Sequence, residues 1–177
     1  MKQGRMVTVM AQGIKIGPAR ALRGTVAIPG DKSLSHRSIM LAGLADTPVK
    51  VRNFLASADC LSTVACMRKL GVSVHLRPDG EVTVQGKGLF GLSEPDNVLD
   101  AGNSGTTIRL LSGLLAGQPF FSVLTGDDSL RRRPMARIVT PLTQMGAKLV
   151  GRENSRYAPV AIEPTASLQG IRYAMPV

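Results

Sequence analysis

The sequence predicts a mixed α/β (α+β) fold made of pseudo-symmetric repeats of a βαβαββ unit. Short segments with apolar residues at alternate positions, typical of strands, alternate along the chain with longer segments whose apolar residues recur every three or four positions, as in a helix. Two echoes indicate a repeat: residues 67–71 (MRKLG) resemble 142–146 (LTQMG), and residues 41–44 (LAGL) resemble 111–114 (LSGL). A chain of 177 residues, 44% of them apolar, is long enough to bury a core. We therefore expect two related units, each burying a helix face against the other.

The first predicted unit covers residues of about 22–88. Alternating apolar residues predict its strands, and polar starts followed by apolar periodicity predict two helices. Asp59 is the expected N-cap of the second helix, and Gly71 is its expected stop. The Pro-Asp-Gly sequence at 78–80 predicts the turn of a hairpin. The expected elements are strands at 22–29 and 49–55, helices at about 32–45 and 60–70, and a hairpin of 72–76 with 81–85.

The second predicted unit covers residues of about 97–164 and repeats this order. Pro134 suits the first turn of a helix, and Pro141 is expected to kink or split that helix. A further strand at 168–177 would begin a third unit, and 14–16 would form a short strand ahead of the first. The expected elements of the second unit are strands at 98–101 and 120–125, a helix that opens within 102–107 and runs through 115, a helix from 134 to about 145, and a hairpin of 148–151 with 158–163.

The first chemical signal is the stretch 28–38, IPGDKSLSHRS, where a predicted strand ends in a Pro-Gly turn and a helix begins. The first N–H groups of a helix lack partners and the dipole is positive there, so such a junction can bind an anion. Lys32 and Arg37 add two positive charges, and Ser33 and Ser35 add hydroxyl donors. The predicted ligand is an anionic substrate, above all a phosphate ester. The alternative is an ordinary capped helix start with solvated charges.

Two later stretches carry the same kind of signal. Residues 100–110, DAGNSGTTIRL, place glycines and hydroxyl groups at another helix start, where a ligand can approach the backbone closely. Residues 124–135, LTGDDSLRRRPM, bring together three arginines, which repel one another unless an anion or carboxylates lie among them. The alternatives are a tight turn for the first stretch, and a solvated basic loop or a nucleic-acid patch for the second.

Composition narrows the range of partners. Lys and Arg outnumber Asp and Glu by 22 to 12, and Arg suits phosphates and carboxylates. Aromatic residues make up only 3% of the chain, which disfavours single-stranded nucleic acid as a partner. Cys60 and Cys66 do not share a helix face, which argues against a metal site or a disulfide. Because no apolar run reaches membrane-spanning length and the start lacks a secretory pattern, we expect a soluble cytoplasmic protein without a membrane partner.

In order and spacing, the three stretches resemble the signatures of the 5-enolpyruvylshikimate-3-phosphate synthase family. The matching patterns are PGDKSxSHRxxxLAGLA, LDxGNSGTTxRL and TGDxSLxxRPM, and the resemblance extends from Leu22 to the C-terminus. It implies an enzyme that transfers the enolpyruvyl group of phosphoenolpyruvate to the 5-hydroxyl of shikimate 3-phosphate and releases phosphate. It implies no metal or organic cofactor. It also implies a target of glyphosate, and tolerant members of the family often carry Ala at the position of Gly105.

The resemblance also implies roles for residues of the three stretches. Lys32 would contact both substrates and take part in catalysis. The residues expected to bind shikimate 3-phosphate are Lys32, Ser33 and Arg37. The residues expected to bind phosphoenolpyruvate are Lys32, Asn103, Gly105 and Arg133. These assignments come from matching positions of the family patterns, and every position except Asn103 also carries the charge, hydroxyl group or small size described above.

The family's enzyme has two lobes of three units each, with the active site between the lobes. The resemblance implies that residues 1–21 pair with the second lobe and that 22–177 form an incomplete N-terminal lobe. We therefore expect a split or truncated synthase that is inactive without a complementing C-terminal chain and self-associates through exposed apolar faces. One alternative is a non-catalytic lobe that binds a phosphate ligand. Another is part of the related nucleotide-sugar enolpyruvyl transferase, which lacks KSxSHR and uses a Cys loop in place of 131–133.

Overall fold

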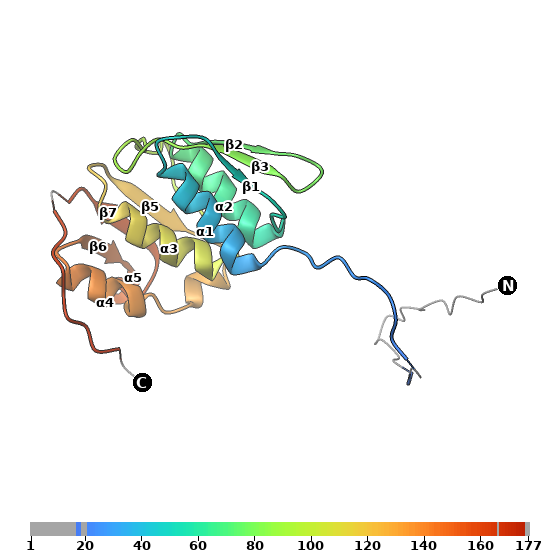
Figure 1. Ribbon diagram of the computed structural model, residues 1–177. Helices are drawn as coiled ribbons and strands as arrows, with labels where there is room; N and C mark the ends of the chain where they lie inside the picture. The colour runs from blue at the N-terminus through green and yellow to red at the C-terminus, as the bar shows by residue number, and fades with distance from the viewer. Residues whose placement is uncertain (1–16, 19–20, 166, 176–177) are drawn as a thin grey trace.

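The computed structural model describes residues 17–18, 21–165 and 167–175, which form a mixed α/β fold. Two β-sheets accompany three helices that contact one another, α1 (Lys32–Gly43), α2 (Ala58–Lys69) and α3 (Gly105–Leu115) (Figure 1). The predicted fold class is therefore confirmed. The short strand expected at 14–16 lies outside the described residues.

The first sheet has the strand order β1-β3-β2, and both of its strand pairs are antiparallel. Its strands are β1 (Val49–Val51), β2 (Ser73–Leu76) and β3 (Val82–Gln85). Val84 of the central strand pairs with Val49 on one side and with Val74 on the other. Gly80 has a φ of 81°, a backbone conformation that suits glycine, and it closes the turn between β2 and β3. The predicted hairpin is confirmed.

The second sheet has the strand order β4-β5-β7-β6, in which β4 and β5 are parallel and the other two pairs are antiparallel. Leu124 of β5 pairs with Leu99 on one side and with Val160 on the other. The second predicted hairpin is confirmed as β6 with β7. The remaining elements of the described chain all follow β3 in sequence. They are β4 (Leu99–Asp100), β5 (Ser122–Thr125), the 3-10 helix η1 (Leu130–Arg132), α4 (Ala136–Gln144), β6 (Lys148–Gly151), α5 (Arg152–Ser155) and β7 (Tyr157–Glu163).

The two sheets share a strand order, because β5-β7-β6 in the second sheet repeats β1-β3-β2 in the first. One sequence echo marks equivalent places: Gly71 and Gly146 each lie two residues after a helix, α2 and α4, with φ of 85° and 97°. The echo between 41–44 and 111–114 does not mark equivalent places, since Gly43 is the last residue of α1 whereas Gly113 lies inside α3. Helix ends and hairpins therefore carry the repeat, and the exact unit boundaries remain predictions.

Two predicted strands are wrong. Residues 22–29 and the described residues 168–175 form no strand. Val26 and Ile28 are 77% and 73% exposed, and the chain around them leads away from the helices (Figure 1). A strand needs the N–H and C=O groups of a neighbouring strand. Among the described residues, segment 22–29 accepts one hydrogen bond, which Nδ2 of Asn53 donates to the Ile28 carbonyl at 3.4 Å. Alternating hydrophobicity does not supply such a neighbour.

Several element ends differ from the predictions. Ser57 and not Asp59 is the N-cap of α2, because its hydroxyl accepts a hydrogen bond from the N–H of Cys60 at 3.4 Å. Asp59 lies inside the first turn, where its negative charge interacts favourably with the helix dipole. The strand β1 is shorter than expected because Asn53 turns the chain with a φ of 55°. Pro141 does not split α4, which runs through it as one helix of 9 residues.

Aliphatic side chains from both sheets and from α1, α2 and α3 form one buried core. Ile108, Leu111 and Leu115 are fully buried, and their spacing places them on one face of α3. Ile39 of α1 and Leu124 of β5 are fully buried in the same core. Within the described ranges, no helix has both the length and the apolarity that crossing a membrane requires. A single core thus joins the two sheets and fixes the three helices relative to one another.

Two helical glycines offer a matched test of this packing. A β-carbon on Gly43 would lie 2.4 Å from Cε of the fully buried Met67, whereas a β-carbon on Gly113 would meet nothing within 4 Å. We expect Gly43→Ala to lower the free energy of unfolding by about 1–3 kcal/mol through overpacking. Gly113→Ala should raise it by about 0.5–1 kcal/mol, because alanine is the better helix former. Urea unfolding followed by circular dichroism measures both, and equal effects of the two substitutions would contradict the packing.

Candidate anion-binding site at three helix N-termini

The first turns of α1, α2 and α3 meet at Asp59. The carboxylate of Asp59 forms an ion pair with Nζ of Lys32 on α1. The backbone carbonyl of Asp59 accepts a hydrogen bond from Oγ1 of Thr107 on α3 at 3.3 Å. Next to it, Sγ of Cys60 donates to the Lys32 carbonyl at 3.7 Å. The positive ends of three helix dipoles therefore lie close together, which favours an anion at this end of the molecule.

On α1, the side chains that are predicted to bind a ligand remain accessible. Asp31 is the N-cap, and its Oδ1 accepts a hydrogen bond from the N–H of Leu34 at 2.7 Å. Ser33 and Arg37 are exposed, and the Lys32 side chain is 51% exposed despite its ion pair with the α2 carboxylate. The side chains predicted to hold shikimate 3-phosphate thus lie within the first two turns of one helix.

Two neighbours of these residues serve the fold. Ser35 is buried, and its Oγ accepts a hydrogen bond from the N–H of Leu55 at 3.0 Å, which joins α1 to the segment after β1. Gly30 passes so close to the backbone that an added β-carbon would lie 1.9 Å from the carbonyl oxygen of Asn53. Only glycine permits this approach, which explains the Pro-Gly pair ahead of α1.

At the start of α3, Asn103 links two of the predicted stretches. Its Nδ2 donates to Oδ2 of Asp127 at 2.7 Å, and its Oδ1 accepts from Nη2 of Arg133 at 2.7 Å. The hydrogen bond from Asn103 holds the pKa of Asp127 below its usual range, and the N–H of Leu130 acts in the same direction. Asp127 is therefore a charged acceptor at neutral pH. The guanidinium of Arg133 is oriented by residues from two separate loops.

Two arginines, Arg109 and Arg133, lie beside Gly105, and the charge of a third, Arg137, lies near Arg109. A β-carbon on this buried glycine would lie 2.8 Å from Nη1 of Arg109 and 3.1 Å from Nη1 of Arg133. Burial lowers the pKa of Arg109, and the nearby charges of Arg137 and Arg133 lower it further. Nη2 of Arg109 donates to the carbonyl of Pro134 at 3.3 Å. The guanidinium groups repel one another, and an anion bound beside Gly105 would relieve that repulsion.

The two other arginines of the third stretch do not join this cluster. Arg131 donates from Nη1 to the carbonyl of Gly126 at 2.8 Å and forms an ion pair with Asp128, so it is tied into its own loop. Arg132 is exposed and lines a shallow hollow with Arg152 and neighbouring residues. We expected an anion or carboxylates among the three arginines, because their charges repel one another. Asp128 supplies one such carboxylate. Of the three, only Arg133 contacts Asn103.

Three residues of the site were not predicted to belong to it: Asp59, Arg109 and Asp127. Arg109 follows Gly105 by four residues, so both lie on one face of α3, and that spacing is a signal available in the sequence. The role of Asp59 as partner of Lys32 depends on how α1 and α2 pack, which no local pattern reveals. Among the described residues, no hydrogen bond or ion pair joins the Ser33–Arg37 segment to the arginines around Gly105.

Metal and thiol chemistry find little support in the described part of the chain. Over those residues, no group of three or more His, Cys, Asp and Glu side chains is arranged to hold a metal ion. Cys60 and Cys66 are buried and free. Burial raises the pKa of the Cys66 thiol to about 12, so it stays protonated and unreactive at neutral pH. Both cysteines serve packing and weak hydrogen bonding.

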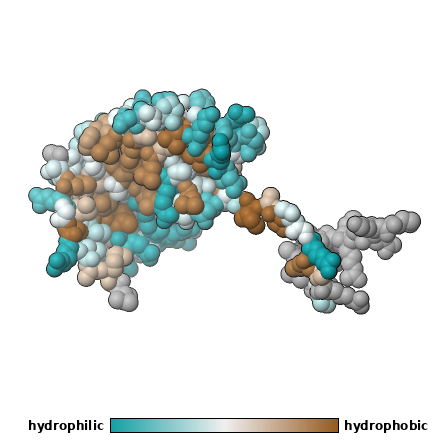
Figure 2. All heavy atoms as spheres, viewed as in Figure 1, coloured by the Kyte–Doolittle hydropathy of each residue, from teal (hydrophilic) through white to brown (hydrophobic). Residues whose placement is uncertain are grey.

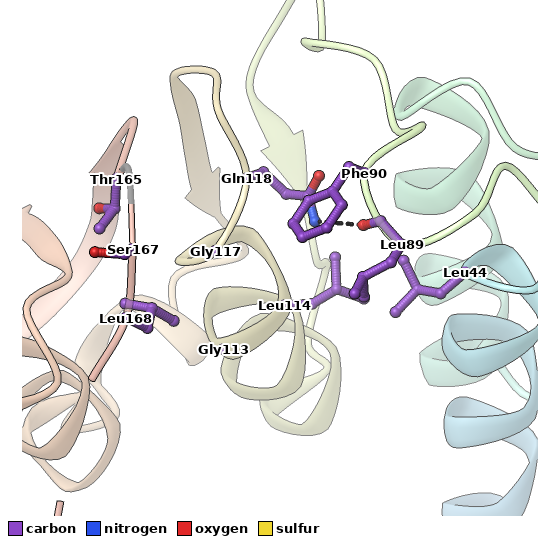
Figure 3. Close-up of a pocket in the computed structure, with 10 residues that line it drawn as sticks. All are labelled: Leu44, Leu89, Phe90, Gly113, Leu114, Gly117, Gln118, Thr165, Ser167 and Leu168. Carbon is purple, nitrogen blue, oxygen red and sulfur yellow. Dashed lines mark hydrogen bonds between the residues drawn. The ribbon is translucent and has the colours of Figure 1, made fainter. Parts of the chain in front are cut away.

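A separate apolar groove of about 510 Å³ lies at the other end of the same helices. Leu44 caps the C-terminus of α1, Leu114 lies in the last turn of α3, and Leu168 faces them across the groove (Figure 3). Nε2 of Gln118 donates to the carbonyl of Leu89 at 3.0 Å, which joins the segment after α3 to the segment after β3 (Figure 3). Since α1 has 12 residues, about 18 Å of helix separates this groove from the charged site.

Comparison with known proteins identifies the family. Residues 16–177 match the family model of EPSP synthase (3-phosphoshikimate 1-carboxyvinyltransferase). A 3-phosphoshikimate 1-carboxyvinyltransferase of Pelotomaculum thermopropionicum is 56% identical over 164 residues, and one of Desulforudis audaxviator is 55% identical over 165 residues. Each match covers 93% of this chain and 38% of the relative. The chain thus spans little more than a third of the length of these relatives.

The fold agrees with the sequence comparison. The EPSP synthase structure from Acinetobacter baumannii matches with a TM-score of 0.82 and 47% sequence identity. That match covers 85% of this chain and 34% of the solved one. The motifs, the fold and the relatives agree, and this chain belongs to the EPSP synthase family.

Proposed function

We propose that this chain supplies part of the active site of a 3-phosphoshikimate 1-carboxyvinyltransferase. The enzyme would transfer the enolpyruvyl group of phosphoenolpyruvate to the 5-hydroxyl of shikimate 3-phosphate and release phosphate. The observation that carries the proposal is the meeting of three helix N-termini at Asp59, beside the exposed Lys32 and the arginines around Gly105. Both substrates carry negatively charged phosphate and carboxylate groups. The helix N-termini, Lys32 and the arginines all contribute positive potential, which favours binding of such groups.

The two predicted substrate positions correspond to two helix starts. Lys32, Ser33 and Arg37 at the start of α1 would hold shikimate 3-phosphate. Asn103, Gly105 and Arg133 at the start of α3 would hold phosphoenolpyruvate. Arg133 is already oriented by Asn103 through Nη2, which leaves its Nη1 beside Gly105 for the ligand. A guanidinium held in place before binding loses less conformational freedom when the anion arrives.

Lys32 is the proposed catalytic residue. Addition of the 5-hydroxyl to the enol carbon needs a proton donor, and the later loss of phosphate needs a base. The ion pair with Asp59 aims Nζ of Lys32 toward the junction of α1, α2 and α3 while half of its side chain stays exposed. Bringing two mutually repelling substrates into contact can lower the barrier by about 7–11 kcal/mol, and this is the main contribution expected of the cations.

The groove at the far end of α1 and α3 supports the proposal of a complementing polypeptide. Leu89 and Phe90 on its rim are 57% and 70% exposed, and apolar side chains gather on the face where α1 and α3 lie (Figure 2). Covering this apolar surface would be favourable. The chain matches 38% of its relatives' length, and the proposed occupant is the polypeptide that the relatives carry outside the matched region. Without it, the chain would bind substrates weakly and lack activity.

Complementation tests the proposed function. The chain is mixed with the part of the Pelotomaculum thermopropionicum relative that it does not match, and phosphate release from the two substrates is followed. We expect release with both polypeptides and none with either alone. Substrate binding without release in the mixture would favour the alternative of a non-catalytic phosphate-binding lobe. A Leu114→Asp variant, which places a charge in the groove, should abolish release by preventing assembly.

Lys32→Ala should remove the catalytic cation from an assembled enzyme. We expect the turnover number for phosphate release to fall by about 10²–10⁴-fold, as is usual when a positioned proton donor is lost. Lys148→Ala is the matched control, because Lys148 is an exposed lysine on β6 whose Nζ lies 3.8 Å from the exposed carboxylate of Glu163. A turnover number for Lys32→Ala within twofold of that of the control would rule out the proposed role.

Gly105→Ala should weaken phosphoenolpyruvate binding selectively. The new β-carbon would displace Nη1 of Arg109 and Nη1 of Arg133, both of which end flexible side chains. We expect the Kd for phosphoenolpyruvate to rise about tenfold, which corresponds to about 1.4 kcal/mol, while the Kd for shikimate 3-phosphate stays within twofold. Calorimetric titration measures both values, with Gly113→Ala as the control. Equal weakening of the two ligands would place Gly105 outside a specific phosphoenolpyruvate site.

A further inference from the structure

A chain of hydrogen bonds runs through the buried interior from α1 to α3. Nδ1 of His36 lies 2.6 Å from Oγ1 of Thr63, and Oγ1 of Thr63 lies 2.7 Å from Oγ1 of Thr107. Oγ1 of Thr107 lies 2.7 Å from Oγ of Ser104. All four residues are 0% exposed, and together they belong to α1, α2 and the first turn of α3 with its N-cap.

We infer that His36 is a positioning residue that acts through Thr63 and Thr107 to hold Ser104, and with it Asn103 and Gly105, in place relative to the start of α1. The inference rests on the proposed function for what the two helix starts bind. His36 would not touch a substrate itself. It would set the distance between the two predicted anion positions by fixing one helix start against the other.

The ends of this chain lie inside the two predicted substrate segments. His36 is one helical turn after Lys32 and directly precedes Arg37. Ser104 lies between Asn103 and Gly105. Its Oγ caps α3 by accepting a hydrogen bond from the N–H of Thr107 at 3.1 Å. A shift of Ser104 would therefore move the α3 cap and the Gly105 backbone together. Misplacement by about 1 Å can cost about 10²-fold in rate.

The direction of the hydrogen bonds identifies the atom of His36 that matters. The single hydroxyl proton of Thr107 is directed to two acceptors, Oγ of Ser104 at 2.7 Å and the carbonyl of Asp59 at 3.3 Å, and not to Thr63. Thr63 then donates to Thr107, and Nδ1–H of His36 donates to Thr63. Burial lowers the pKa of His36 against the opposing charge of Asp59, which keeps the imidazole neutral at neutral pH. A neutral ring with a proton on Nδ1 carries none on Nε2.

The other ring nitrogen shows that His36 is not there merely to fill space. Nε2 is buried and has no hydrogen-bond partner among the described residues. An unpaired buried polar atom is unfavourable, and an apolar side chain of similar size would avoid that cost. The contribution specific to histidine is therefore the Nδ1–H donor that begins the chain toward Ser104.

Two matched pairs of variants test this role. Thr63→Val and His36→Leu remove a hydroxyl or a donor, whereas Thr63→Ser retains the hydroxyl and His36→Asn places an amide N–H near the position of Nδ1. In each protein, NMR gives the hydrogen-exchange rate of the Thr107 amide and the Kd for inorganic phosphate at the Gly105 amide. We expect both quantities to rise about tenfold in Thr63→Val and His36→Leu, and to stay within twofold in Thr63→Ser and His36→Asn.

A control for general loosening is Val64→Ala, which makes a cavity beside Thr63 without touching the hydrogen-bond chain. If Val64→Ala raised Thr107 exchange as much as Thr63→Val, or if Thr63→Val left it unchanged, His36 would be a structural residue only and the inference would fail. Absence of phosphate binding at Gly105 in the unsubstituted chain would count against the proposed function instead. The exchange rates alone would then decide whether His36 positions the start of α3.

Discussion

The contact on which the site depends is the one that Asp59 makes with both neighbouring helices. Its carboxylate pairs with Lys32 on α1, and its carbonyl accepts from Thr107 on α3. Three positive helix ends and a lysine would repel one another if they were brought together without a negative group. Asp59 supplies that group from within the first turn of α2. The shared core brings the three helix starts together, and the contacts of Asp59 offset the repulsion that this convergence creates.

The direction of α1 and α3 organises the rest of the molecule. Their N-termini carry the charged side chains and the buried chain from His36 to Ser104. Their C-termini border the apolar groove around Leu44 and Leu114 (Figure 3). Because both helices run the same way, the charged side chains and the apolar groove are placed at opposite ends. A partner can therefore cover the groove without displacing a ligand from the charged site.

Much of the fold could be predicted from local sequence patterns. Both hairpins and the Gly71 helix stop depend on turn chemistry within a few residues, and all of them are confirmed. The strand at 22–29 was wrong because pairing needs a distant neighbour that hydrophobic alternation does not reveal. Charge and glycine spacing were enough to single out the three stretches that we predict to bind anions. The contacts of Asp59, and the chain from His36, arise only when separate helices pack together, so no single stretch could indicate them.

A crystal structure of the chain with shikimate 3-phosphate and phosphoenolpyruvate would test the central claim, that adjacent helix N-termini hold both anions. We predict one phosphate against Lys32, Ser33 and Arg37 at the start of α1, and the second ligand against Gly105 and Arg133 at the start of α3. Ligand density in the basic hollow beside Arg132, with both helix starts empty, would contradict the account.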